Sequence, residues 1–148
     1  SCENGERTLR CIRKHAAILE RAECRMVNCD LWEANILCER KADGIRYVMI
    51  DPERGYWGDP IMDFICFEFG KPLKQKTLSL KAYNRLAEHP IAAGPEEEIR
   101  FAFAQALLGV VMEVERYYRY APGDEGWTRN DGECEMLFTA AFGCLEGK

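Results

Sequence analysis

Residues 27–37, VNCDLWEANIL, and residues 50–63, IDPERGYWGDPIMD, are the two stretches that decide how this chain folds. Between them lie two short runs of apolar and β-branched residues, Ile36 to Cys38 and Ile45 to Ile50, with the sequence Ala42-Asp43-Gly44 in the middle. Such runs on either side of a glycine-containing turn are typical of a β-hairpin. The sequence therefore predicts a hairpin with one polar loop before it and another after it.

The two polar loops carry the side chains on which chemistry would depend. Asp30 and Asn35 lie in the first loop, and Asp51 directly follows the second apolar run. A carboxylate can orient a hydroxyl nucleophile, while an amide oxygen and a second carboxylate are ligands that suit Mg²⁺. Because phosphoryl transfer needs these groups together, we expect Asp30 to act on a hydroxyl and Asn35 and Asp51 to hold the metal.

The same two stretches resemble the catalytic and metal-binding loops of the aminoglycoside phosphotransferase and choline kinase superfamily. The catalytic loop of that family has the pattern His-Gly-Asp-x-x-x-x-Asn, and this chain has NCDLWEAN at residues 28–35. The second family signature, Ile-Asp-x-Glu followed by Gly-Asp-Pro-x-x-Asp, is matched by residues 50–53 and 58–63. The matched stretches cover about a quarter of the chain, and the departures from the family pattern are Asn28 and Cys29.

The resemblance implies an ATP- and Mg²⁺-dependent kinase that phosphorylates a hydroxyl group of a small molecule, such as an aminoglycoside, an amino alcohol or a sugar. It gives Asp30 the role of catalytic base and Glu53 that of a further metal-site carboxylate beside Asn35 and Asp51. The apolar floor of the nucleotide site would be formed by Leu37 and Ile50, although plain core strands explain these two residues equally well.

Residues around the loops are expected to support their shape. Asp59 is a good helix N-cap before Pro60 at the first helical position, and Asp63 falls in the first turn, where it would complement the helix dipole. The resemblance gives Asp63 a second role, which is to accept backbone N–H groups of the catalytic loop. Asn28 replaces the family histidine and has a donor and an acceptor with which to support the loop.

Composition sets limits on the class of protein. The chain has 148 residues, of which 47% are hydrophobic, and a net charge of −5. These values predict one domain and argue against nucleic acid as the main partner, which would require a basic surface. No apolar run is long enough to span a membrane. The eight cysteines lack zinc-site spacing, so we expect free thiols in a reducing compartment, the cytoplasm.

The remaining sequence is predominantly helical. Helical periodicity predicts helices over residues 6–23, from about residue 73 to 88, from Pro95 onward and over residues 131–145. In the first helix, Leu9, Ile12, Ala16 and Leu19 are expected to form the packing stripe. The predicted fold class is thus α+β and mainly helical, a single domain over residues 1–148 that resembles the C-terminal lobe of a protein kinase, with the hairpin carrying both loops.

A kinase of this class also needs an N-terminal lobe with a phosphate-covering loop and a strand lysine, and none can be placed before Asp30. We therefore expect this chain to be an inactive C-terminal fragment that binds nucleotide weakly and self-associates through the face containing Leu37 and Ile50. Two alternatives remain: a pseudokinase-type binding or scaffold module, suggested by Asn28 and Cys29, and a purely structural helical interaction domain.

Overall fold

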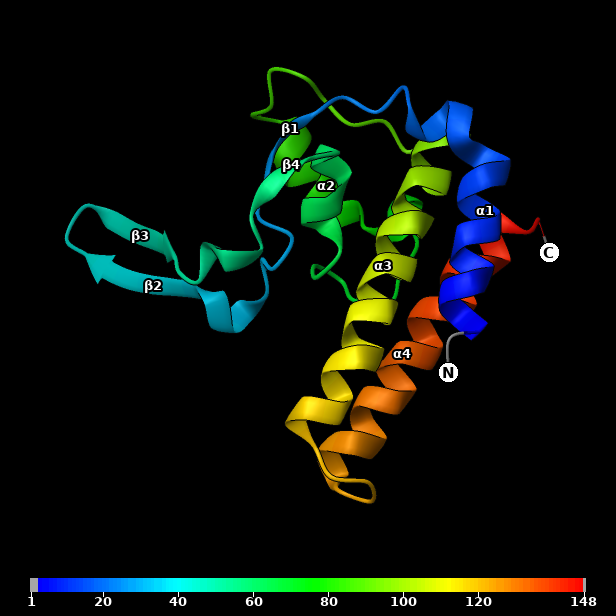
Figure 1. Ribbon diagram of the computed structural model, residues 1–148. Helices are drawn as coiled ribbons and strands as arrows, with labels where there is room; N and C mark the ends of the chain where they lie inside the picture. The colour runs from blue at the N-terminus through cyan, green and yellow to red at the C-terminus, as the bar shows by residue number, and fades with distance from the viewer. Residues whose placement is uncertain (1–2, 148) are drawn as a thin grey trace.

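The computed structural model describes residues 3–147, which form a mainly helical α+β structure (Figure 1). The helices are α1 (Glu3–Leu19), α2 (Thr77–Asn84), α3 (Pro95–Arg119) and α4 (Glu125–Leu145). The strands are β1 (Arg25–Val27), β2 (Ile36–Lys41), β3 (Gly44–Met49) and β4 (Tyr56–Gly58). Short 3₁₀ helices occupy Glu33–Asn35 (η1), Pro52–Arg54 (η2), Pro60–Phe64 (η3) and Leu73–Gln75 (η4).

Helix α3 is the central element, because both hydrophobic cores are built on it. On one side α3 packs against α4 and α1, and the first core comprises Cys11, Ala102, Phe103, Ala106, Cys134, Phe138, Ala141, Phe142 and Leu145. The two long helices approach closely at Gly109, where an added methyl group would lie 3.0 Å from the ring of Phe138. On its other side α3 holds the second core, made of Ile61, Phe64, Ile65, Leu73, Ile91, Phe101 and Ala104.

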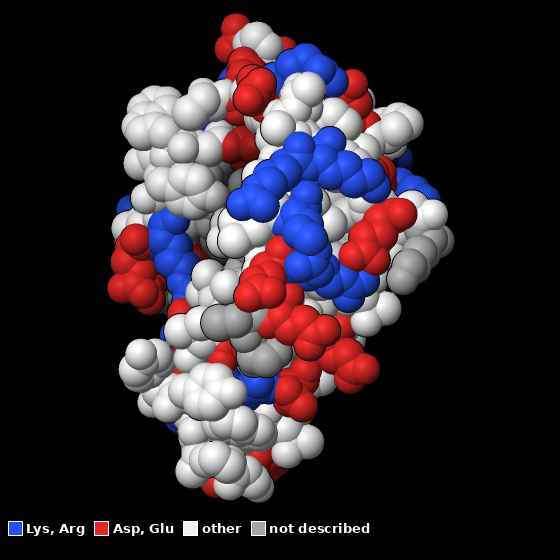
Figure 2. Space-filling view, turned by 45° about the vertical axis from the view of Figure 1, so that its right-hand side comes forward, with Lys and Arg blue, Asp and Glu red and all other residues white. Residues whose placement is uncertain are grey.

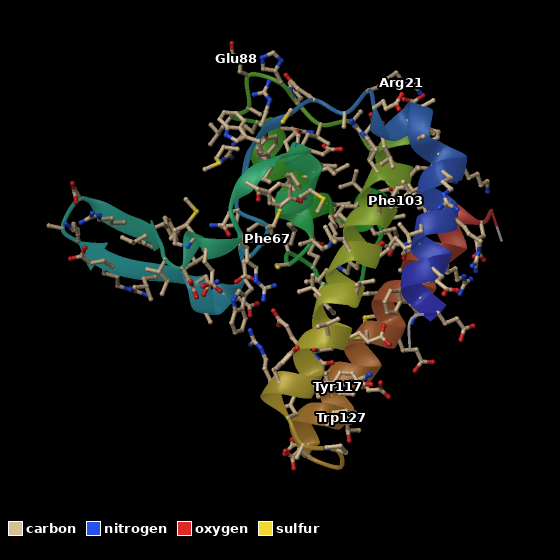
Figure 3. All side chains as sticks on the ribbon, in the orientation of Figure 1. Arg21, Phe67, Glu88, Phe103, Tyr117 and Trp127 are labelled. Atoms are coloured by element: carbon tan, nitrogen blue, oxygen red, sulfur yellow. The ribbon has the colours of Figure 1, made fainter. Side chains whose placement is uncertain are left out.

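The expected start of the longest helix is confirmed at Pro95, with Glu96, Glu97 and Glu98 in its first turn. Proline suits this position because the first helical N–H has no intrahelical acceptor, and the carboxylates face the positive end of the helix dipole. Helix α4 begins at Glu125, six residues before the predicted start. The polar composition of residues 121–130 predicted a loop there, but packing against α3 extends the helix. Trp127 of α4 contacts Tyr117 of α3, with ring centroids 5.2 Å apart (Figure 3).

Helix α1 differs from the prediction in the face that it buries. Leu9 is 54% exposed and Ile12 is 38% exposed, whereas Cys11 is buried. The reason is that α1 is fixed by polar contacts to the end of α4: Lys14 Nζ and His15 Nε2 both lie 2.9 Å from the carbonyl oxygen of Leu145. Cationic and N–H groups at a helix C-terminus satisfy its free carbonyls, and they turn the predicted stripe partly toward solvent.

Two antiparallel two-stranded sheets complete the fold, β1 with β4 and β2 with β3. The predicted hairpin is confirmed: β2 pairs with β3 from Ile36 opposite Met49 to Lys41 opposite Gly44, around a two-residue turn. Figure 1 shows this hairpin projecting from the body of the molecule. The pairing of β1 with β4 was not predicted, because strands of three residues give too short a pattern to identify.

Lys76 is a charged side chain placed inside the second core. Its side chain is fully buried, and Nζ donates hydrogen bonds to the carbonyl oxygens of Phe67 and Glu68, the latter at 3.1 Å. The nitrogen also lies 5.0 Å from the ring centroid of Phe101. Burial lowers the pKa of Lys76 to about 8. Lys76 therefore gives the carbonyl oxygen of Phe67 a partner and that of Glu68 a second one, since Glu68 also accepts the backbone N–H of Lys71 at 3.2 Å.

Acidic and basic side chains are intermixed on the surface. Figure 2 shows Lys and Arg in an arc, with Asp and Glu beside it on the same face. Ion pairs join several charged side chains, among them Arg7 with Glu146 at 2.6 Å and Arg21 with Glu96 at 2.7 Å. None of the helices in the described part of the chain is long and apolar enough to cross a bilayer.

Candidate functional site

The first polar loop is held closed by a single carboxylate. Oδ1 of Asp63 accepts hydrogen bonds from the backbone nitrogens of Asn28, at 2.7 Å, and Cys29, at 2.9 Å. Cys29 itself has a left-handed backbone, with φ of +59°. The position thus favours glycine, which is the residue in the signature that the loop resembles. The pairing of β1 with β4 brings the two segments together.

Asn28 supports the same loop from within. Its side-chain oxygen accepts a hydrogen bond of 3.0 Å from the backbone nitrogen of Asp30. Asparagine commonly closes a turn on the N–H two residues ahead in this way. The substitution of asparagine for the family histidine therefore leaves a side chain that holds the backbone of Asp30 in place.

Asn35 fixes the orientation of Asp30. Asn35 is buried, and its Nδ2 donates to the Asp30 carboxylate oxygen Oδ2 at 2.8 Å and to the Asp30 carbonyl at 3.0 Å. Both contacts use the amide nitrogen, so the amide oxygen of Asn35 is the atom left to accept or to coordinate. One side chain thus holds Asp30 and keeps an oxygen with which it can accept a hydrogen bond or coordinate.

Asp51 is brought next to Asn35 by the hairpin. The backbone nitrogen of Ile50 donates to the carbonyl oxygen of Asn35 at 3.0 Å, which extends the β2–β3 register by one pair. Asp51 then turns away with φ of +56° and ψ of +58°. This left-handed conformation is uncommon for a residue other than glycine, asparagine or aspartate. The structure therefore places the two predicted metal ligands at the same end of the hairpin.

Glu53 lies in η2, immediately after Asp51, and both side chains are exposed. Helix η2 is tied to α3 by Arg54, whose guanidinium lies 2.5 Å from a carboxylate oxygen of Glu115. Sequence reasoning missed this ion pair, because the partners are 61 residues apart. Arg54 therefore fixes the position of the loop that carries the two exposed carboxylates.

The donor set suits a hard divalent cation by its chemistry. An amide oxygen from Asn35 and carboxylates from Asp51 and Glu53 are all oxygen ligands of the kind that Mg²⁺ takes, usually with water completing the coordination. Over residues 3–147, no group of three or more His, Cys, Asp or Glu side chains is placed so that it could hold a metal ion. The residues fit Mg²⁺ as a partly hydrated ion rather than as a closed protein cage.

Leu37 and Ile50 lie on one face of the hairpin. Leu37 is directly opposite Val48, and Ile50 follows Val48 by two residues, so all three side chains point to the same side. Leu37 is 52% exposed and Ile50 is 39% exposed. The interpretation of the two residues as plain core is therefore wrong, because the β2–β3 hairpin projects from the body instead of packing into it. They form an apolar surface beside Asn35 and Asp51.

Asp59 has the predicted capping role. Its carboxylate accepts a hydrogen bond of 3.1 Å from the backbone nitrogen of Ile61 at the start of η3. The other carboxylate oxygen lies 3.4 Å from Nε of Arg100 on α3, a partner that sequence reasoning missed. Burial raises the pKa of Asp59, and the Ile61 N–H and the Arg100 charge oppose that rise. Asp59 thereby joins the segment that carries Asp63 to the central helix.

Tyr56 is a second residue that sequence reasoning did not assign to the loop. Its hydroxyl group lies near the thiol of Cys29, and burial raises the pKa values of both groups. No sequence signal pointed to this contact, because it depends on the pairing of β1 with β4. Cys29 is thereby contacted from both sides, at its backbone by Asp63 and at its side chain by Tyr56.

Comparisons with known proteins identified no relative of this chain. No protein-family model, curated protein or solved structure matches the chain.

Proposed function

We propose that this chain is the C-terminal lobe of an ATP- and Mg²⁺-dependent phosphotransferase that acts on a hydroxyl group of a small molecule. The observation that carries the proposal is the hydrogen bond between the Asn35 amide and the Asp30 carboxylate, inside a loop that Asp63 holds closed. A loop with only a structural role does not need Asn35, which is buried, and Asp63, which is half-buried, to hold Asp30 in place. A phosphotransferase needs Asp30 oriented and an oxygen of Asn35 turned toward a metal.

In this proposal each group of the chain has a defined task. Asp30 accepts a hydrogen bond from the substrate hydroxyl, orients its oxygen and takes its proton, as a general base within hydrogen-bond reach does. The Asn35 amide keeps the carboxylate aimed, and Asn28 and Asp63 keep the backbone of Asp30 in place. Mg²⁺, when bound by Asn35 and Asp51 with Glu53 nearby, would neutralise charge on the phosphate oxygens.

The nucleotide would be held only in part by the described residues. Leu37 and Ile50 offer an apolar surface next to the metal ligands, but the chain before β1 forms helix α1 and not a phosphate-covering sheet. We therefore assign the phosphate-covering lobe and the adenine hinge to protein outside residues 3–147. For this chain alone we expect a dissociation constant for ATP and Mg²⁺ in the millimolar range, because each missing charged contact costs about 1.5–3 kcal/mol.

A binding module without catalysis is the second candidate. Asn28 and Cys29, which replace the histidine and glycine of the resembled signature, favour it. The retention of Asp30 in an oriented state favours the enzyme, since binding alone does not require a base. A purely structural helical domain explains the α1, α3 and α4 packing but leaves both loops without a purpose.

The metal part of the proposal is tested on the chain itself with Mn²⁺, which replaces Mg²⁺ and broadens nearby NMR signals. We expect the amide signals of Asn35, Ile50 and Asp51 to broaden first. Asp51→Asn should weaken this effect at least about tenfold, because a charged oxygen ligand becomes neutral. Asp43→Asn, in the exposed hairpin turn, is the matched control and should leave the titration unchanged. Broadening centred elsewhere would remove these residues from the metal site.

The catalytic part is tested on the full-length protein with ATP, Mg²⁺ and a panel of sugars, aminoglycosides, choline and amino alcohols. Asp30→Ala should reduce turnover of the active substrate by about 10²–10⁴-fold, the usual contribution of a general base, while the fold is retained. Asp43→Ala should have full activity. Turnover by Asp30→Ala within about threefold of wild type would contradict the assignment, and ATP binding without any turnover would favour the binding module.

A further inference from the structure

The outer edge of strand β3 is an exposed surface that the proposed site does not use. Strand β3 pairs with β2 alone, so its other edge has no strand partner within the described residues. Three large side chains on β3 are mostly exposed: Ile45 at 54%, Tyr47 at 64% and Met49 at 65%. An apolar edge strand of this kind is a template for pairing with another chain, and proteins normally protect it with charges or bulges.

The hydrogen-bond pattern of the hairpin shows which groups of this edge are free to pair. The bond from Ile50 N to Asn35 O defines residues 35 and 50 as a hydrogen-bonded pair. Hydrogen-bonded and non-hydrogen-bonded pairs alternate along an antiparallel ladder, so Val48 and Arg46 also direct their backbone groups toward β2. Residues 45, 47 and 49 must then direct their N–H and C=O groups outward.

The residues with outward backbone groups are therefore the three with exposed apolar side chains. We propose that β3 pairs with β3 of a second copy of this chain, antiparallel and centred on Tyr47. In that register Ile45 lies opposite Met49 of the second copy, and Tyr47 lies opposite its own equivalent. Three hydrogen-bonded pairs would form about six main-chain hydrogen bonds, and two hairpins would become one four-stranded sheet.

The side chains of this edge are self-complementary on both faces of the new sheet. On one face, Ile45, Tyr47 and Met49 meet only apolar partners across the interface. On the other face, Arg46 lies opposite Val48 of the second copy, so no like charges are brought together. Arg46 is already near a carboxylate of its own hairpin, with a nitrogen 3.9 Å from Glu39. Cross-strand pairs of this type contribute roughly 0.2–1 kcal/mol each.

The outer edge of β2 is less suited to the same pairing. By the same alternation, its outward backbone groups belong to residues 36, 38 and 40, and Arg40 is among them. A charged side chain at an exposed edge is a common protection against strand pairing. The apolar side chains of β3 therefore decide which edge is used, and Cys38 on β2 provides a control position on the same face as Tyr47.

This inference does not rest on the proposed function, and it differs from the sequence-based expectation of self-association through Leu37 and Ile50. Those two residues lie on the opposite face of the hairpin from Tyr47. An edge of six residues buries less surface than the roughly 800 Å² per partner of a standard stable interface. We therefore expect a weak dimer with a dissociation constant on the order of 10–100 µM.

Sedimentation velocity over a range of concentrations tests the pairing. Wild type should shift from monomer to dimer, and Tyr47→Lys should raise the dimer dissociation constant at least about tenfold, because it places like charges on the two-fold axis. Tyr47→Pro should do the same, since the only backbone group that it removes is an N–H that points away from β2. Cys38→Lys adds the same charge on the same face of the other edge and should stay within about twofold of wild type.

Amide hydrogen exchange gives a readout of the register itself. The amides of residues 45, 47 and 49 should gain protection as the protein concentration rises, and those of residues 46 and 48 should be protected throughout. The pairing is overturned if wild type stays monomeric near about 1 mM, well above the expected dissociation constant. It is equally overturned if Cys38→Lys dissociates the dimer as strongly as Tyr47→Lys, because the contact would then lie elsewhere.

Discussion

Oδ1 of Asp63 lies 2.9 Å from the backbone nitrogen of Cys29, and the same oxygen accepts the N–H of Asn28. One carboxylate thus satisfies two successive backbone donors, the second of which belongs to a residue in the left-handed conformation. Hydrogen bonds to a charged acceptor are stronger than neutral ones. The relationship links the short helix η3 to the loop that presents Asp30.

Removing this carboxylate should therefore weaken the fold measurably. Asp63→Ala leaves two partly buried N–H groups without an acceptor, and we expect the free energy of unfolding to fall by about 2 kcal/mol. Asp63→Asn keeps an uncharged acceptor oxygen and should cost about half as much. Urea unfolding measures both changes. Asp43→Ala, in the exposed hairpin turn, should change stability by less than about 0.5 kcal/mol, and a similar result for Asp63→Ala would contradict the anchoring role.

The backbone of Cys29 gives a second prediction, which is a comparison of two variants. Cys29→Gly and Cys29→Ala both remove the thiol and its contact with Tyr56, but only alanine keeps a Cβ at a φ of +59°. The glycine variant should therefore be more stable than the alanine variant by about 1 kcal/mol.

The same comparison at Cys38 in strand β2 is the control. There the order should reverse, with glycine less stable than alanine by about 0.5–1 kcal/mol, because glycine loses more conformational entropy in a regular strand. Thermal or urea unfolding of the four variants decides the matter. An alanine variant at least as stable as glycine at position 29 would show that the left-handed turn is not maintained in solution.

The lowered pKa of Lys76 predicts an unusual dependence of the free energy of unfolding on pH. Its folded pKa is lowered by burial from 10.5 to about 8, so between these values the unfolded chain binds more protons than the folded one. Stability then rises with pH in this window. Relative to Lys76→Met, wild type should gain about 2–3 kcal/mol between pH 8 and pH 10.5, at about 1.4 kcal/mol per pKa unit.

Denaturant unfolding of wild type and Lys76→Met at several pH values measures this gain. The difference between the two proteins is the informative quantity, because tyrosines and thiols that titrate in the same range are common to both. A difference that does not change with pH would mean that Lys76 stays charged through its bonds to the carbonyl oxygens of Phe67 and Glu68.

The cysteines should differ in reactivity according to burial. The seven cysteines that the structure describes are all free thiols. Burial raises the pKa values of Cys66 and Cys134 to about 11, so at pH 8 only about one in a thousand of these thiols is ionised. Cys24 and Cys38 are exposed. Brief alkylation followed by peptide mass mapping should label the exposed pair first, and early labelling of Cys66 or Cys134 would show that the core opens readily.

Several parts of this structure could be predicted from sequence because the signal is local. The β2–β3 hairpin follows from two apolar runs around Ala42-Asp43-Gly44, and the start of α3 follows from Pro95 with its carboxylates. The spacing of Asp30 and Asn35 identified a pair that the structure joins by a hydrogen bond of 2.8 Å. In each case the residues that decide the outcome lie within a few positions of one another.

Tertiary contacts decided the rest. The pairing of β1 with β4 sets Asp63 against Cys29, and the ion pair of Arg54 with Glu115 fixes the loop that carries Asp51, across separations that no local pattern records. The exposure of Leu9 on α1 has the same origin, because polar contacts to the end of α4 set the rotation of that helix. Sequence periodicity determines which residues share a face, but only packing against distant segments determines which way that face points.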